Sequence, residues 1–358
     1  MDAKVLSLES GGSVVTTRAQ MDKVCDMLES AKIMSFDFET GGLDFLTDKI
    51  AGLGIATDNG LRCYIPFEHS KIDTLCESDI VYALKGYFES EKILLIGHNL
   101  KFDVQFLWNL GIDVGRKFDN KLMADTVIMA WLLDENRISF KLDRLLRDYF
   151  HVNTTEFDQL VEDGKVSVFD VDINAISEYC IKDAVGCLKL YEIFKTQLET
   201  QRLADVFWRV EMRMVKVLAL MERRGVYIDI NLLGDYHKRI KKDLEGLRKE
   251  ILQLAGKEFN MNSGDQLGKI LFSKPPEGFG APIQGYTPGG KKPRKDGTLA
   301  PPKPKTDANT IRALTIGNQP WSEFCNTLLR YKDLAKIEST YIRGLLELVR
   351  AEIGRAHV

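Results

Sequence analysis

Four acidic residues stand in three separated segments of this chain, each where a regular element is expected to begin or end. Asp37 and Glu39 follow an apolar run of strand length, in Ser-Phe-Asp-Phe-Glu-Thr. Residues two apart on a strand point to the same face, so these two carboxylates share one side. Asp103 and Asp183 lie in segments with helical periodicity. One fold could bring these four carboxylates into a single cleft, and this possibility restricts the candidate folds more than any other feature.

Carboxylates packed together repel one another, and such a cluster persists mainly when cations neutralise it. Hard oxygen ligands of this type suit magnesium or manganese. Tyr179 precedes Asp183 by four residues, so one helix face carries both the phenol and the carboxylate. Each pattern alone is weak, since many strand ends and helices carry such residues by chance. As a set they predict a nuclease with two divalent ions, Mg²⁺ or Mn²⁺, because paired ions commonly serve to cut phosphodiesters.

Apolar runs at residues 33–38, 50–56, 62–67 and 93–96 predict strands, and Asn59-Gly60 predicts a hairpin turn between the second and the third. Helices are expected at residues 18–30, after a cap at Thr16 or Thr17, and at 77–89, 101–110, 123–133, 141–149 and 173–199. Strands followed by helices interleaved with a further strand indicate an α/β domain with a mixed, five-stranded sheet.

From about residue 202 the pattern is helical almost throughout, with long helices expected at 209–224, 231–255 and 324–350. The charge also changes, because residues 1–200 carry a net charge of −13 and residues 201–358 carry +10. A basic half suggests a nucleic-acid partner, although two oppositely charged surfaces that dock together would show the same asymmetry.

Residues 273–305 interrupt the helical half with eight of the ten prolines, six glycines and an excess of lysine. This composition predicts a flexible basic loop that does not fold alone. A solvated linker is one interpretation of the loop. A segment that follows a phosphate backbone is the other.

The six cysteines show no Cys-x-x-Cys spacing, so free thiols are expected. The N-terminus lacks the pattern of a signal peptide, and no apolar run is long enough to span a bilayer. These features predict a cytoplasmic protein with no membrane partner.

Three segments together resemble one superfamily: Ser-Phe-Asp-Phe-Glu-Thr-Gly-Gly-Leu-Asp, Ile-Gly-His-Asn-Leu-Lys-Phe-Asp and Tyr-Cys-Ile-Lys-Asp-Ala, with Asp-Thr-Val-Ile-Met-Ala at 125–130 between them. They are similar to the proofreading 3′–5′ exonucleases, in the branch of the ribonuclease H-like fold that uses tyrosine. The resemblance covers about residues 14–199. It implies an exonuclease domain at residues 1–200 that acts on single-stranded 3′ ends.

The resemblance also implies roles for single residues. Asp37 would bridge two ions, Glu39 and Asp183 would complete one ion site, and Asp103 would support the other. Tyr179 would orient the attacking water. The end nucleotide would be contacted by Thr40, Leu43, Asn99 and Phe102, although core packing is the more expected role of Phe102. His98, beside the site, is expected to play at most a supporting part.

The second half resembles family A DNA polymerases, at Val-Glu-Met-Arg-Met-Val-Lys, Phe-Asn-Met-Asn-Ser-Gly-Asp-Gln-Leu and Tyr-Lys-Asp-Leu-Ala-Lys-Ile-Glu-Ser-Thr-Tyr. Residues 201–358 are therefore expected to form a mostly helical thumb-like region that grips a primer–template duplex. The DNA-binding residues expected there are Asn262, Ser263, Lys291, Lys292, Lys336, Ser339 and Thr340.

No palm or fingers motif occurs before Val358, so we expect this chain alone not to polymerise. A gene truncated at this point and a split polymerase with palm and fingers on a second polypeptide both fit. The leading interpretation is a DNA exonuclease in a bacterial or phage replication polymerase. An exonuclease that trims RNA 3′ ends and a DNA-binding module of a split polymerase are the alternatives.

Overall fold

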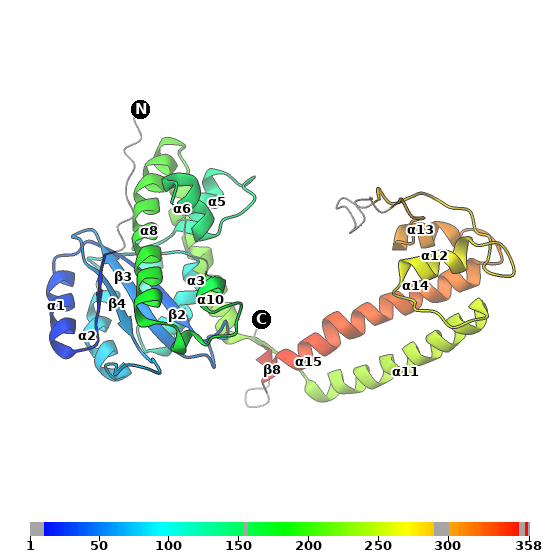
Figure 1. Cartoon of the computed structure of the whole chain (residues 1–358), viewed down its shortest axis with the longest axis horizontal. Coiled ribbons are helices and arrows are strands. Elements are labelled where there is room, and N and C mark those ends of the chain that lie inside the picture. Colours follow the sequence, from blue (N-terminus) through cyan, green and yellow to red (C-terminus); the bar gives the residue numbers. More distant parts are fainter. Residues whose placement is uncertain (1–10, 153–156, 290–300, 351–354, 357–358) are drawn as a thin grey trace. The chain divides into compact units, whose positions relative to one another are not determined.

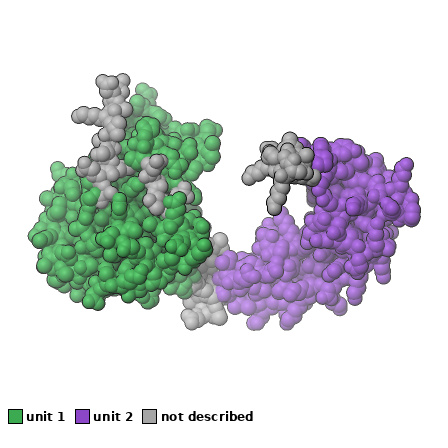
Figure 2. Space-filling view, in the orientation of Figure 1, with its two compact units in different colours: residues 1–223 green, residues 224–358 purple. Residues whose placement is uncertain are grey.

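The structure is a computed structural model that describes residues 11–152, 157–289, 301–350 and 355–356. It contains two compact units, residues 1–223 and residues 224–358 (Figure 2). The first unit continues past the predicted domain border at residue 200. It does so because helix α10 (Met212–Arg224) buries Met212 and Val215 in the main core of that unit.

A six-stranded mixed sheet forms the centre of the first unit, with the strand order β1-β4-β3-β2-β5-β6. Strands β2, β3 and β4 are antiparallel neighbours, whereas β5 and β6 run parallel to β2, and β1 runs parallel to β4. The strands are β1 (Ser13–Val14), β2 (Ile33–Thr40), β3 (Ile50–Thr57), β4 (Arg62–Pro66), β5 (Leu94–Gly97) and β6 (Met123–Asp125).

The longer helices of the first unit lie close to the predicted positions, and several short helical segments that were not predicted lie between them. They are α1 (Arg18–Leu28), α2 (Glu77–Glu89), α3 (Leu100–Asn109), α4 (Gly115–Asp119), α5 (Thr126–Leu133), α6 (Leu142–Phe150), α7 (Phe157–Leu160), η1 (Val168–Asp170), α8 (Ile173–Thr200), α9 (Ala204–Val206), η2 (Phe207–Glu211) and α10. Thr17 caps α1 and forms a capping box with Gln20, and Gly60 has the positive φ of 96° that the hairpin turn requires.

The predicted number of five strands is wrong by one. The segment 123–133 was expected to be helical throughout, but Met123–Asp125 pairs with β5 before α5 begins. Strand β1 contains only two residues, which is too short to show an alternating pattern. Strands β1 and β6 are both stabilised by pairing with neighbouring strands, and the local sequence does not show this pairing.

Strand β2 separates two layers of the first unit. Phe36 and Phe38 point to the face where α1, α2 and α3 pack, and they join the main core there. Asp37 and Glu39 point to the opposite face, which α8 covers as it crosses β2, β3 and β4 (Figure 1). The alternation of apolar and acidic residues in β2 thus sends the carboxylates toward α8.

A glycine of β3, Gly54, gives α8 room to approach this face. Gly54 pairs with Asp37 across the sheet, and Gly52 pairs with Glu39. A Cβ atom at Gly54 would lie 2.7 Å from Sγ of Cys180 and 2.8 Å from the carbonyl oxygen of Cys180. The backbone of α8 therefore rests on the sheet at Gly54, where β3 carries no side chain.

The second unit is built on two long antiparallel segments, α11 (Ile230–Ala255) and the continuous run of α14 (Ser322–Lys336), η3 (Ile337–Arg343) and α15 (Gly344–Leu348). The other elements are β7 (Val226–Tyr227), α12 (Gly264–Phe272), α13 (Ala308–Leu314), β8 (Val349–Arg350) and β9 (Arg355–Ala356). Its core lies where α11, α12, α13 and α14 meet, around Ile251, Leu271 and Phe324. His237 of α11 contacts Glu338 at 3.0 Å.

The described parts of the Pro- and Gly-rich loop, residues 273–289 and 301–305, are more ordered than the composition predicted. Ala281 is buried in the core of the second unit, and Tyr286 forms a β-bridge with Pro304. Lys303 contacts Asp265 at 2.5 Å. The expectation of a loop that does not fold alone missed these contacts because they join it to the surrounding helices.

In the parts of the chain that the structure describes, no helix is both long enough and apolar enough to cross a membrane.

Replacing Gly54 with alanine should destabilise the first unit by about 1–3 kcal/mol, since the new methyl group collides with the α8 backbone. Urea unfolding of the full chain measures the change. Gly86→Ala is the matched control, because Gly86 lies within α2 with no atom within 4 Å of an added Cβ. That substitution should be neutral or stabilise the chain by up to about 1 kcal/mol. Equal effects of the two substitutions would contradict the close packing of α8.

Candidate active site

All nine residues that the sequence assigned to the exonuclease site line one cavity of about 1010 Å³ in the first unit. They are Asp37, Glu39, Asp103, Tyr179, Asp183, Thr40, Leu43, Asn99 and Phe102. Strand β2, the first turn of α3 and the middle of α8 supply the carboxylates. The structure therefore brings together the three segments that lie far apart in the sequence.

The carboxylates are held at different depths. Asp103 is buried, and its Oδ1 accepts a hydrogen bond of 3.1 Å from the backbone N–H of Phe38, which fixes α3 against β2. Glu39 is also buried, and its Oε1 has no hydrogen-bond partner among the described residues. Asp37 and Asp183 are partly exposed to the cavity.

Burial raises the pKa of every carboxyl group in this set. For Asp37 the charge of Asp103 adds to the effect of burial, and for Glu39 the charges of Asp37 and Asp183 do so. Burial raises the pKa of Asp103 to about 8. Burial and the charge of Asp37 raise the pKa of Asp183. Groups that repel in this way form a ready site for divalent cations, and the unpartnered Glu39 oxygen supplies a free ligand atom.

Tyr179 completes one side of the cavity. Its hydroxyl lies close enough to the Asp183 carboxylate for each group to shift the pKa of the other. Burial and then the negative charge of Asp183 raise the pKa of Tyr179, so the phenol stays protonated at neutral pH. The ring lies 6.0 Å from the ring of Phe157, measured between centroids. Tyr179 is therefore held as a neutral hydrogen-bonding group beside the carboxylates.

The four residues expected to contact a nucleotide differ in how they are held. Leu43 is 87% exposed at the rim, and the hydroxyl of Thr40 donates to the Gly42 carbonyl at 2.7 Å, fixing the turn that leads to Leu43. Asn99 has left-handed backbone angles. Phe102 is partly buried and its ring lies 5.0 Å from that of Phe106, so it packs on the core while it also lines the cavity.

Asp125 is a residue of this region to which the sequence argument gave no role. Its buried carboxylate accepts hydrogen bonds from the backbone N–H groups of Asn99 at 3.0 Å, Leu100 at 2.8 Å and Val127 at 2.9 Å. One side chain thus caps both α3 and α5, and it fixes the turn from which Asn99 and Asp103 project. The signal that could have revealed it is an aspartate directly before a helical apolar run, which is typical of an N-cap.

His98 is partly buried, and its two ring nitrogens contact groups other than the carboxylates. Its Nδ1 lies 2.8 Å from the Thr126 hydroxyl, and its Nε2 lies 3.0 Å from the Phe140 carbonyl oxygen. Burial lowers the pKa of His98 to about 4, so the ring is neutral. These contacts give His98 a structural role beside the site.

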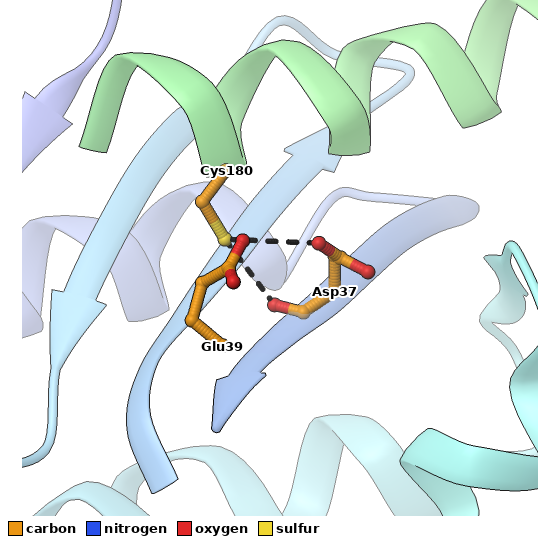
Figure 3. Close-up of side chains that lie close together, drawn as sticks. All are labelled: Asp37, Glu39 and Cys180. Carbon is orange, nitrogen blue, oxygen red and sulfur yellow. Dashed lines mark hydrogen bonds between the residues drawn. The ribbon is translucent and has the colours of Figure 1, made fainter. Parts of the chain in front are cut away.

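Cys180 is a second residue whose role the sequence argument missed. It follows Tyr179 on α8, and its thiol donates to the Asp37 carbonyl oxygen at 3.5 Å while Sγ lies 4.0 Å from Asp37 Oδ2 (Figure 3). The Glu39 carboxylate also lies close to the sulfur, since ligand atoms of Asp37, Glu39 and Cys180 are all within 4.8 Å of one another. The one sequence signal that could have indicated that Cys180 lies at the site is that it directly follows Tyr179.

The residues expected to contact DNA in the second unit are placed in part. Ser263 caps α12, and Asn262 directly before it is exposed. Lys336, Ser339 and Thr340 are exposed near the junction of α14 and η3. Lys291 and Lys292 lie outside the described residues.

A mixed sheet flanked by helices, with four carboxylates and a tyrosine in one cavity, defines an exonuclease domain of the ribonuclease H-like fold. Sequence profiles agree: one described as 3′–5′ exonuclease matches residues 13–199, and one described as DNA polymerase family A matches residues 230–358. The chain belongs to the 3′–5′ exonuclease family of the family A DNA polymerases.

Among curated relatives, the chain is 29% identical to DNA polymerase I of Pseudomonas aeruginosa over 350 residues, which are 96% of the chain and 36% of that protein. It is 25% identical to the DNA polymerase of Escherichia phage T5 over 342 residues, which are 89% of the chain and 37% of that protein. The chain thus spans about a third of the length of these relatives.

A solved structure with the same fold is the POL domain of Pol1 from M. smegmatis, in complex with DNA primer-template and dNTP. It has a TM-score of 0.69 at 19% identity, and the match covers 97% of the chain and 52% of that structure.

Magnesium should stabilise the protein more strongly at alkaline than at acidic pH. The folded-state pKa of Asp103, about 8, lies above its ordinary value of 3.8, so stability present below about pH 4 is lost as pH rises through 8. In EDTA we expect Tm to fall between about pH 6 and about pH 9. Because the ion binds deprotonated carboxylates, the rise of Tm on adding Mg²⁺ should be larger at the higher pH.

Thermal unfolding by circular dichroism measures both effects, with Asp37→Asn as the variant that lacks a central carboxylate. A magnesium effect that is independent of pH, or that is unchanged in Asp37→Asn, would argue against a metal site in this cavity.

Substituting Asp125 with asparagine should destabilise the chain by about 1–3 kcal/mol, because the amide nitrogen faces a backbone N–H that then has no acceptor. Urea unfolding measures this difference. Asp134→Asn is the control, since Asp134 ends the same helix but is exposed and accepts one hydrogen bond, from the N–H of Asn136, which asparagine can also accept. If both variants unfold like the parent chain, the capping role of Asp125 is wrong.

Proposed function

We propose that this chain removes nucleotides from DNA 3′ ends by hydrolysis that depends on two divalent ions, as the proofreading part of a family A DNA polymerase. The single observation that supports it most is the meeting of Asp37, Glu39, Asp103, Asp183 and Tyr179 in one cavity. A cavity of about 1010 Å³ has room for the end of a single strand. The match to the exonuclease profile over residues 13–199 supports the same activity.

Asp37, Glu39 and Asp183 would hold one ion, and Asp37 together with Asp103 would hold the other. When bound, such ions lower the pKa of a water nucleophile and stabilise charge on the leaving oxygen. Tyr179, kept protonated by burial beside Asp183, orients the attacking water through its hydroxyl and does not act as a strong base. Asp125 keeps α3 in the position from which Asp103 reaches the site.

Residues at the rim would bind the end nucleotide. Leu43 is free to insert against the terminal base, because its side chain is almost fully exposed on a turn fixed by Thr40. Asn99 and Phe102 come from the start of α3 and offer an amide and an aromatic edge. Contacts of this kind tolerate any base, which suits a trimming enzyme.

We assign the grip on primer–template duplex to the helical half of the chain, residues 201–358, of which the second unit begins at residue 224. The expected contacts are Asn262, Ser263, Lys291, Lys292, Lys336, Ser339 and Thr340. The excess of positive charge in this half supports backbone binding. Polymerisation would need palm and fingers segments, from the same gene or from a separate polypeptide. The bacterial and phage relatives of this chain favour a location in the cytoplasm of a bacterial or phage-infected cell.

The full chain should release nucleotides from 3′-labelled single-stranded DNA in the presence of Mg²⁺ or Mn²⁺, and Asp37→Ala should lower the rate by at least about 10³-fold. Tyr179→Phe should lower the rate by about 10- to 100-fold without loss of metal binding. The assay follows labelled mononucleotide over time, on single-stranded DNA, mispaired duplex and RNA.

Asp22→Ala is the matched control, since Asp22 is an exposed carboxylate on α1, away from the cavity. It should retain the parent rate. Failure to release nucleotides from DNA with either ion, or full activity of Asp37→Ala, would refute the proposed function. Preference for RNA over DNA would instead identify an RNA-trimming enzyme.

A further inference from the structure

A sulfur atom lies among the oxygen ligands of the proposed nuclease site. Cys180 is fully buried, and its position on α8 brings Sγ to 4.0 Å from Asp37 Oδ2. Ligand atoms of Asp37, Glu39 and Cys180 all lie within 4.8 Å of one another, which is close enough for the three residues to hold one metal ion. Figure 3 shows the sulfur next to the Glu39 carboxylate, with dashed lines from the sulfur to Asp37.

A second observation indicates that this group has an unfilled place. Glu39 is buried at 6% exposure, and its Oε1 has no hydrogen-bond partner in the described parts of the chain. Buried polar atoms are nearly always satisfied, so an unpaired carboxylate oxygen beside a thiol indicates a missing ligand. A cation that takes both oxygen and sulfur ligands would satisfy it.

The donor set decides which cation fits. Magnesium takes oxygen ligands alone, whereas zinc and similar ions bind cysteine thiolate together with carboxylate oxygen. We propose that Asp37, Glu39 and Cys180 form a site for a thiophilic divalent ion of the zinc class. This inference rests on the proposed function in one respect: such an ion would occupy carboxylates that hydrolysis needs, and so would inhibit it.

The distances allow this with small movements of the side chains. With zinc–sulfur and zinc–oxygen bonds of about 2.3 and 2.0 Å, two ligands of one tetrahedral zinc lie roughly 3.5 Å apart. Sγ and Asp37 Oδ2 are already 4.0 Å apart. On binding, the metal–sulfur bond forms, the S–H bond breaks and its proton leaves to solvent. No oxidation or reduction takes place.

The competing explanation is that Cys180 only fills space under β3. Gly54 leaves room for its sulfur there, and its thiol donates to the Asp37 carbonyl oxygen at 3.5 Å. This packing role predicts no bond between sulfur and a metal ion. The two explanations therefore differ in a spectroscopic signal that does not require catalysis.

Cadmium is the probe, because cadmium bound to thiolate absorbs in the ultraviolet by charge transfer from sulfur. The full chain, with the exposed Cys76 changed to serine, is freed of metal and titrated with Cd²⁺. We expect the charge-transfer band to saturate at one ion per chain and to disappear in the additional variant Cys180→Ser. Cys187→Ser is the matched control, since it removes another buried thiol of α8, and it should keep the band.

Circular dichroism confirms that each variant is folded before titration. Asp37→Asn should weaken Cd²⁺ binding by at least about tenfold while the thiol is still present. Absence of the band in the parent chain, its persistence in Cys180→Ser, or its loss in Cys187→Ser alone would overturn the assignment.

A parallel assay separates this inference from the proposed function. Zn²⁺ is added to the Mg²⁺-dependent hydrolysis of single-stranded DNA, and the zinc concentration for half inhibition should rise at least about tenfold in Cys180→Ser relative to the chain with Cys180. A chain that binds Cd²⁺ through Cys180 but does not hydrolyse DNA refutes the nuclease and leaves the ion site standing. An active nuclease without the cadmium band refutes the ion site alone.

Discussion

The contact between the α8 backbone and β3 is the constraint on which the nuclease site depends. At Gly54 the sheet carries no side chain, and the carbonyl of Cys180 occupies the space that a Cβ atom would need. Because Gly54 pairs with Asp37 across the sheet, the same close approach brings the next residues of α8 to the acidic end of β2. Tyr179 and Asp183 reach the carboxylates of β2 only because α8 lies so close to the sheet.

Such packing works against electrostatics, since burial and mutual repulsion raise the pKa of all four carboxyl groups. The fold holds them in place by contacts on the far side of each element. Phe36 and Phe38 anchor β2 in the core, and the backbone of Phe38 donates to Asp103. Asp125 caps the helix that carries Asp103. Without a cation, the carboxylates repel one another, and contacts elsewhere in the fold keep them together. A cation that binds between them removes this repulsion and therefore binds strongly.

The sequence was sufficient to predict the carboxylates, the tyrosine and most helices, because periodicity and short motifs are local. All nine residues expected at the exonuclease site line one cavity, and the role of each stays a prediction. The misses concern contacts that local patterns do not record. Strand β6 was expected to be helical, and Asp125 was quoted within a motif but given no role, since its partners Asn99 and Leu100 lie far away in the sequence. The proline-rich loop was expected to be flexible and not to fold alone, and Ala281 packs in a core that other helices provide.

Cys180 shows how one packing solution can set a chemical property. The helix position that carries Tyr179 to the cavity also directs the next side chain to the face of the sheet, beneath Asp37 and Glu39. Any residue at this place must be small, because Gly54 leaves little more room than a sulfur atom requires. Serine, alanine and cysteine all satisfy that steric condition, but only cysteine adds a soft ligand to a hard set. If the proposed ion site exists, metal discrimination there would depend on a residue that helix–sheet packing limits to a small side chain, in addition to the four carboxylates.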